Sequence, residues 1–204
     1  MRNLLALLVL LATPLAARAA DLEVILKDAR GQPVPDAVVT FTPAQAPGRA
    51  PHFDWPMIMA QHNIAFDPHV LIVPVGADVT FPNQDTVRHD VYSFSAAKRF
   101  ELKLYGREQA RTVHFDKAGV VAVGCNIHDR MSGFIFVTST PFAAKTDAAG
   151  RAVIAGAPDG AGALGIWQED LKTPGNAITR PLAVHGATRQ ALTLDLRPHP
   201  AMKM

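Results

Sequence analysis

A thiol, an imidazole and a thioether lie three residues apart in one short segment of the chain. They belong to Cys125, His128 and Met131. An apolar run precedes them and another follows, so the segment is predicted to be a tight loop between two strands that can turn all three side chains toward one centre. A second imidazole, that of His89, stands 36 residues upstream of the cysteine, where a preceding strand ends.

These four residue types point to copper. Two histidines and a thiolate in a trigonal arrangement, with a weak axial methionine, bind type 1 (blue) copper. Sulfur ligands suit Cu(I) and imidazole suits both oxidation states, so the set favours electron transfer. A catalytic metal keeps an open position for substrate, whereas four protein ligands leave none. We therefore expect one copper ion per chain, held by His89, Cys125, His128 and Met131, in a protein that is not an enzyme.

The segment resembles the cupredoxin family, and its amicyanin type in particular. The Cys-x2-His-x2-Met spacing and the Asn-x-Asp-Thr-Val-x-His stretch that ends at His89 carry the resemblance, which covers roughly residues 66–137. It implies a Greek-key β-sandwich in which both histidines are imidazole ligands, the cysteine is the thiolate and the methionine is the axial ligand. After the first histidine stands Asp90, where amicyanin has asparagine, so hydrogen bonds around the site are predicted to differ.

The rest of the chain has the pattern of short strands separated by turns, which predicts an all-β fold. Residues 30–39 and 146–151 resemble parts of a carboxypeptidase-regulatory-like β unit, found beside a cupredoxin core in exported proteins labelled methylamine-utilisation or plastocyanin-like. We expect the cupredoxin domain at 58–138, inserted in an additional small β-sandwich unit formed by the N-terminal segment 21–50 and the C-terminal segment 141–198.

Two local features carry further expectations. One turn of helix is expected near residues 95–100. The continuous run of small apolar residues at 119–124 is typical of a strand that is buried on both faces.

The first twenty residues have the pattern of a secretory signal peptide of the Gram-negative type. Arg2 gives a positive start, Leu4 to Leu11 form an apolar core, and the cut is expected after Ala19 or Ala20. The apolar run is too short to span a bilayer well, and we expect no membrane span after cleavage. The expected location is periplasmic or secreted.

Loss of the leader would leave the chain near neutral. The sequence has 20 Lys and Arg residues against 18 Asp and Glu, and the leader contains two of the arginines. Without a basic patch, neither nucleic acid nor anionic lipid is an expected partner. Cys125 is the only cysteine, so an intramolecular disulfide is excluded and the thiol is free for another role.

Three functions are consistent with these features. The first is a carrier of single electrons between transient redox partners, such as a cytochrome or a periplasmic oxidoreductase, that docks through apolar residues around His128. The second is copper delivery or storage, which could add a Met/His cluster; packing of that loop on the sandwich is the preferred interpretation. The Met/His cluster of this second function comprises His52, Met57, Met59 and His62. The third function is a metal-free scaffold or adhesion module.

Overall fold

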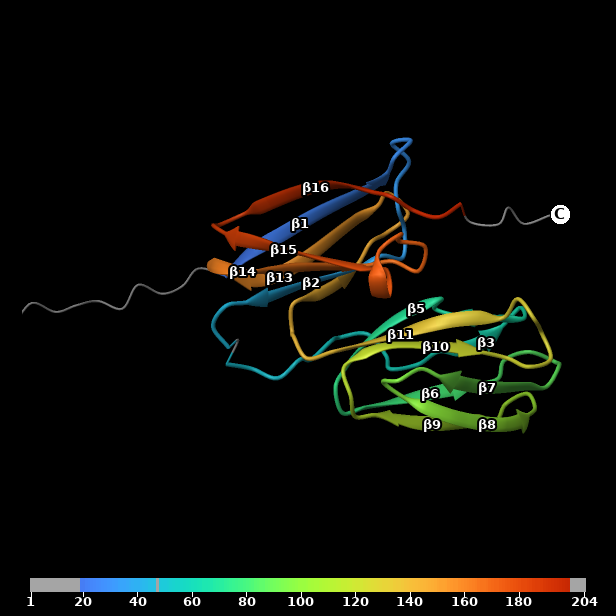
Figure 1. The fold of residues 1–204 in the computed structure, drawn as a ribbon. Helices are drawn as coiled ribbons and strands as arrows, with labels where there is room; N and C mark the ends of the chain where they lie inside the picture. The colour runs from blue at the N-terminus through green and yellow to red at the C-terminus, as the bar shows by residue number, and fades with distance from the viewer. Residues whose placement is uncertain (1–18, 47, 199–204) are drawn as a thin grey trace, which may run out of the picture.

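A computed structural model describes residues 19–46 and 48–198, so the predicted leader up to residue 18 lies outside the described residues. The described chain is all-β, as the sequence predicts; its helical content is one 3-10 turn, η1 (Pro174–Asn176). No helix among the described residues is long and apolar enough to cross a membrane. The strands form two β units, drawn one above the other in Figure 1.

The upper unit in Figure 1 has a sheet with β1 at its centre. β1 (Ala19–Asp28) pairs antiparallel with β13 (Arg151–Pro158) and parallel with β16 (Thr188–Leu194). Apolar and polar residues alternate along β1, so that Leu22 and Val24 are buried on one face while Glu23 between them is not. The alternation of apolar and polar residues therefore determines which face of this sheet packs into the core.

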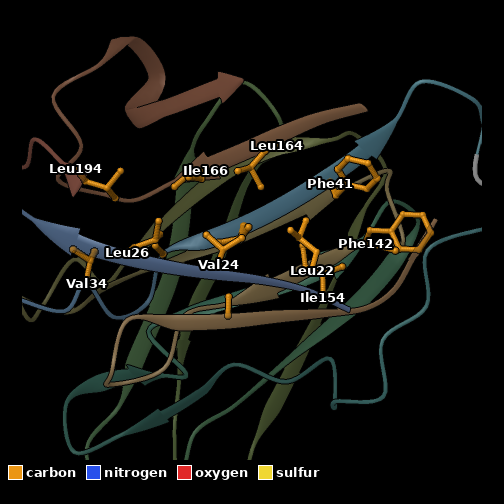
Figure 2. Packing of buried hydrophobic residues seen from close by; sticks show 14 of the residues in the cluster. Leu22, Val24, Leu26, Val34, Phe41, Phe142, Ile154, Leu164, Ile166 and Leu194 are labelled. Carbon is orange, nitrogen blue, oxygen red and sulfur yellow. The ribbon is translucent and has the colours of Figure 1, made fainter. Parts of the chain in front are cut away.

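The facing sheet has β15 (Ala177–Val184) as an edge strand, which the sequence analysis did not predict. Pro181 lies within it, and an edge strand tolerates a proline because its outward side needs no N–H donor. Figure 2 shows the apolar side chains of the two sheets meeting in one core. The other strands of this sheet are, in order, β12 (Ala143–Lys145), β2 (Val38–Pro43) and β14 (Gly160–Trp167).

The lower unit is a second β-sandwich with its own apolar core. Its larger sheet has the order β5 (Val70–Pro74), β11 (Ser132–Thr138), β10 (Gly119–Gly124), β7 (His89–Phe94) and β8 (Arg99–Tyr105). Two antiparallel pairs complete it: β6 (Ala77–Pro82) with β9 (Ala110–Phe115), and β3 (Ala60–His62) with β4 (Ala65–Asp67). β7 and β10 are neighbours although 24 residues separate them in the chain, so this pairing brings distant segments together at one end.

Two local predictions were wrong. Residues 95–98 form a bend instead of a helical turn, because Phe94 pairs with Arg99 across the β7–β8 hairpin and leaves only a short connection. β10 is fully buried on one face only: Val121 and Val123 point into the core, while on the other face Val120 is partly buried and Ala122 is exposed. The small side chains of this strand therefore do not reflect burial on both faces.

Apolar side chains join the two units. Val70 and Ile72 of β5 share a buried cluster with Val38 of β2 and Trp167 of β14. The Trp167 ring also packs against Phe134 of β11, with ring centroids 5.1 Å apart. The outer face of the larger lower sheet is thus partly covered by the upper unit.

An ion pair reinforces this junction. His69 Nε2 lies 2.8 Å from Glu169 Oε1, and the imidazole packs edge-on against Phe134. The hydrogen bond to Glu169 raises the pKa of His69 above its usual value, against the opposing effect of burial. The charges of Glu169 and Asp36 and a hydrogen bond to the backbone of Ser132 also raise this pKa. No local sequence pattern predicts this pair, because its members are 100 residues apart.

Replacing Glu169 with glutamine is expected to remove a pH-dependent contribution to stability. Because the pKa of His69 is raised in the folded state, the contribution is fully present below pH 6.5, the value for a free histidine, and is lost as the pH rises through the higher folded-state pKa. The pair is partly exposed, so it should contribute no more than about 1 kcal/mol, or about 2–4 °C in Tm.

Thermal unfolding of wild type and E169Q at about pH 5.5 and about pH 9 measures this contribution. Wild type should have the higher Tm at the lower pH, and the difference in Tm between the two proteins should be smaller at the higher pH. An equal difference in Tm at both pH values would show that the charge of His69 does not contribute to stability.

Candidate metal centre

The structure brings His89, Cys125 and His128 together at one end of the lower sandwich. His89 is the first residue of β7, Cys125 directly follows β10, and His128 lies in the loop between β10 and β11. One ligand atom from each residue lies within 4.8 Å of the other two. His89 and Cys125 are buried, and His128 is partly exposed. No other group of three or more His, Cys, Asp or Glu residues with this spacing occurs in the described part of the chain.

The distances within this group fit a trigonal metal site. The Nδ1 atoms of His89 and His128 lie 3.8 and 3.6 Å from Cys125 Sγ. Metal–nitrogen bonds of about 2.0 Å and metal–sulfur bonds of about 2.3 Å at about 120° would place nitrogen and sulfur about 3.7 Å apart. Both imidazoles therefore present Nδ1 to the space that a metal ion shared with the thiolate would occupy.

Met131 lies close to Cys125 and His128. It is buried, belongs to the same apolar cluster as Cys125, and lines the same surface hollow. Backbone hydrogen bonds fold the loop into a compact turn: Met131 N–H donates to His128 O at 2.8 Å, and Cys125 N–H donates to Met131 O at 3.2 Å. This turn holds the backbone of Met131 close to that of Cys125.

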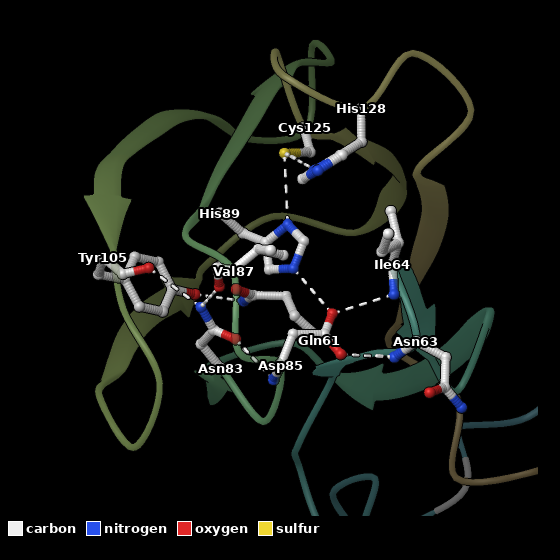
Figure 3. A network of polar contacts seen from close by, with 10 residues as sticks. All are labelled: Gln61, Asn63, Ile64, Asn83, Asp85, Val87, His89, Tyr105, Cys125 and His128. Atoms are coloured by element: carbon white, nitrogen blue, oxygen red, sulfur yellow. Dashed lines mark hydrogen bonds and ion pairs between the residues drawn. The ribbon is translucent and has the colours of Figure 1, made fainter.

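Asp85 fixes the orientation of the His89 ring, as Figure 3 shows. Its Oδ2 atom lies 2.8 Å from His89 Nε2. Its two carboxylate oxygens also accept the backbone N–H groups of Asn63 and Ile64, at 2.7 and 3.0 Å. Burial opposes ionisation, yet these hydrogen bonds and the one to His89 hold the pKa of Asp85 below its usual value. An ionised Asp85 accepts a hydrogen bond from the Nε2–H group of His89. The proton of the neutral imidazole therefore stays on Nε2, and Nδ1 is free to bind a metal.

Asp90 anchors the loop that carries the thiol. Its Oδ1 accepts the backbone N–H of Asn126 at 2.7 Å, and its Oδ2 accepts the side-chain amide of the same residue. Burial works against ionisation of Asp90, but these hydrogen bonds keep its pKa below the usual range. Burial raises the pKa of the Cys125 thiol, and the charge of Asp90 adds to this effect.

A buried polar network supports the residues behind His89. Asn83 donates through Nδ2 to the carbonyl oxygens of Val87 and Tyr105, at 2.9 and 3.0 Å, and accepts the Asp85 N–H. Tyr105 donates its hydroxyl to Phe81 O and accepts a hydrogen bond from Gln61. Burial raises the pKa of Tyr105 to about 12, so the hydroxyl stays protonated. Figure 3 shows Asn83, Gln61 and Tyr105 on the side of the His89 imidazole that faces away from Cys125.

Sequence reasoning missed Asp85, Gln61 and Tyr105 as supporting residues. An available signal was the position of Asp85, four residues before His89 in a turn opened by Asn83. Gln61 and Tyr105 belong to β3 and β8, and no local pattern relates them.

The Met/His cluster does not form a second site. Met59 is fully buried in the apolar core, and Met57 packs against that core. His52 is exposed beside Asp54, with 3.5 Å between Nε2 and Oδ1, and His62 is also exposed. The side chains thus follow the preferred interpretation, in which this loop packs on the sandwich.

Comparisons with known proteins gave structural likeness only. No family model matches the chain, and no curated protein matches it. A reduced variant of amicyanin is similar over 49% of this chain and 98% of its own, with 21% identity and a TM-score of 0.39. A purple cupredoxin from Nitrosopumilus maritimus is similar over 40% of this chain and 96% of its own, with 25% identity and a TM-score of 0.36. With likeness this limited, any function for the chain has to be argued from its own site.

Replacing Met131 with leucine should keep the visible colour of a copper-loaded protein and raise its reduction potential. The thioether is the weak axial donor, so its loss leaves the thiolate and both imidazoles in place but stabilises Cu(I) relative to Cu(II). Leucine has a similar volume, so the buried position should tolerate the change.

Voltammetry measures this effect, and a rise of about 59 mV corresponds to a tenfold change in the redox equilibrium. Met59→Leu is the matched control, because Met59 is a buried methionine of the same apolar cluster with no assigned role as a ligand. An unchanged or lower potential in the Met131 variant would contradict the axial role.

Proposed function

We propose that this protein is a cupredoxin that holds one type 1 copper ion through His89, Cys125, His128 and Met131 and transfers single electrons between redox proteins. The observation that carries the proposal is the convergence of two Nδ1 atoms on one buried thiol sulfur, at 3.8 and 3.6 Å. This donor set is the one that type 1 copper uses. The bound copper would supply reversible one-electron chemistry.

The protein's own contribution is to hold the donors in one arrangement. Asp85 fixes the His89 ring through Nε2, and Asp90 fixes the backbone of Asn126, which follows the thiol. Burial of His89 and Cys125 keeps water from the inner side of the site. Because His89 and the loop that carries the thiol are held by partners outside the donor set, little movement is needed when the charge of the site changes by one.

An apolar surface at the metal end supports docking to a redox partner. Three loops that meet here each present an exposed aliphatic side chain: Ile64 is 50% exposed, Val87 41% and Ile127 51%. Ile64 is tied to Asp85 through its N–H, and Ile127 directly precedes the partly exposed His128. A partner that covers these residues would approach the one ligand of the set that is not buried, in the small and transient contact typical of redox proteins.

We further propose that the chain is exported to the periplasm after loss of the leader. The positive start, apolar core and small-x-small site at the N-terminus support this location. An oxidising compartment is compatible with a single cysteine that serves as a metal ligand, because no second cysteine can trap it in an intramolecular disulfide.

Copper retention during redox cycling separates a carrier from a delivery protein. The copper-loaded protein is reduced, challenged with a Cu(I)-specific chelator such as bicinchoninate, and then reoxidised. A carrier should keep its copper in both states and recover its full visible absorption. Loss of Cu(I) to the chelator with retention of Cu(II) would instead indicate delivery. In voltammetry, a reversible wave from a protein that keeps its copper would support the carrier.

A further inference from the structure

A cleft of about 450 Å³ opens where the two β units meet. Trp55 and Ile58 line it from the segment before β3, Val70 and Ile72 from β5, and Lys145 and Val153 from the upper unit. Val70 and Ile72 also belong to the buried cluster that joins the units. The cleft is therefore a continuation of that apolar interface into solvent, at a position where ligand sites often occur in proteins.

Trp55 has a fixed ring with one face available. Its indole N–H donates to Ile72 O at 2.8 Å, and the ring stacks on Phe53 with centroids 4.6 Å apart and planes 11° apart. Trp55 is nevertheless 37% exposed and Ile58 is 42% exposed. Two of the large apolar side chains that stay exposed thus line the same cleft, although burial of either would stabilise the protein.

The charge in the cleft is balanced. Lys145 is the one charged residue among those that line it, and its Nζ lies 2.7 Å from Asp36 Oδ1. An ammonium group has three N–H donors, so the ion pair leaves Lys145 able to donate to a second acceptor. The cleft thus offers an aromatic face, aliphatic walls and a hydrogen-bond donor without a net charge.

We propose that this cleft is a binding site for an uncharged, planar aromatic compound that carries a carbonyl or hydroxyl group. The compound stacks against Trp55, buries its edges against Ile58 and Val153, and accepts a hydrogen bond from Lys145. An anionic or cationic compound is disfavoured because Asp36 already neutralises the lysine. The site does not depend on copper.

Titration with prodan, an uncharged naphthalene ketone with solvent-sensitive fluorescence, tests the proposal on the full mature protein. We expect one saturable site, a blue shift of the probe emission and a dissociation constant on the order of 100 μM. Trp55→Ala and Ile58→Asp should each weaken binding about tenfold or more. Phe94→Ala is the matched control, because Phe94 is 73% exposed and lies outside the cleft.

Binding that does not saturate would overturn the proposal, as would equal affinity in wild type and the Ile58 variant. Loss of binding in the Phe94 variant alone would place the site elsewhere and also overturn it. Trp55→Ala removes a stacked ring and a hydrogen bond, so its fold is checked by circular dichroism. Ile58 is partly exposed, and its variant decides the question if Trp55→Ala does not fold.

Discussion

Cys125→Ser is expected to abolish the intense visible band of the copper-loaded protein. That band requires a thiolate bound to Cu(II), and Cys125 is the only cysteine in the chain. A serine hydroxyl is a hard donor that stays protonated near neutral pH, so it cannot replace the thiolate. The measurement is the visible absorption spectrum after addition of one equivalent of Cu(II).

The same variant should keep its fold. Serine is close in size to cysteine, and Cys125 makes no disulfide bond. The Tm of the metal-free protein should therefore change little, which separates loss of a ligand from loss of structure. A correctly folded Cys125→Ser protein that stays blue would end the assignment of Cys125 as a ligand.

Asp85→Asn is expected to weaken copper binding by about 10- to 100-fold. The carboxylate oxygen near His89 Nε2 also accepts the Ile64 N–H. Asparagine removes the negative charge, and its one carbonyl oxygen has to replace two oxygens that together accept N–H groups of Asn63, Ile64 and His89. The acceptor that keeps the His89 proton on Nε2, and so leaves Nδ1 free toward Cys125, is thereby weakened.

Competition with a chelator of known affinity, followed at the visible band, measures the change. Asp78→Asn is the matched control, since Asp78 also lies 2.8 Å from a histidine nitrogen, that of His114, but on exposed strands away from the site. Equal copper affinity in Asp85→Asn and wild type would show that Asp85 does not select the tautomer of His89.

The grouping of the three proposed loop ligands could be predicted from the sequence because their spacing is local. Cys125, His128 and Met131 lie within seven residues between two apolar strands, so the chain needs no distant contact to place them near one another. His89 was predicted as the second imidazole and from the resemblance of the stretch that ends there, and it lies beside Cys125 because β7 is the neighbour of β10. The observed register pairs Tyr92 with Gly124, directly before the cysteine.

The supporting contacts depend on pairings that no local pattern encodes. Gln61 meets Tyr105 from 44 residues away, and His69 meets Glu169 from 100 residues away. Each pair forms only because strands of different hairpins or different units come together. The helical turn predicted near residues 95–100 was wrong for a related reason. The pairing of Phe94 with Arg99 across the hairpin determines the shape of the connection more than the helix propensity of its residues does.

The most direct test is the visible and EPR spectrum of the protein without its predicted leader, after addition of one equivalent of Cu(II). The geometry of His89, Cys125 and His128 predicts an intense blue thiolate-to-copper band and a narrow copper hyperfine splitting. A colourless protein with an ordinary copper EPR signal would mean that the thiolate does not bind the metal. That result would contradict the type 1 site and the electron-transfer function built on it.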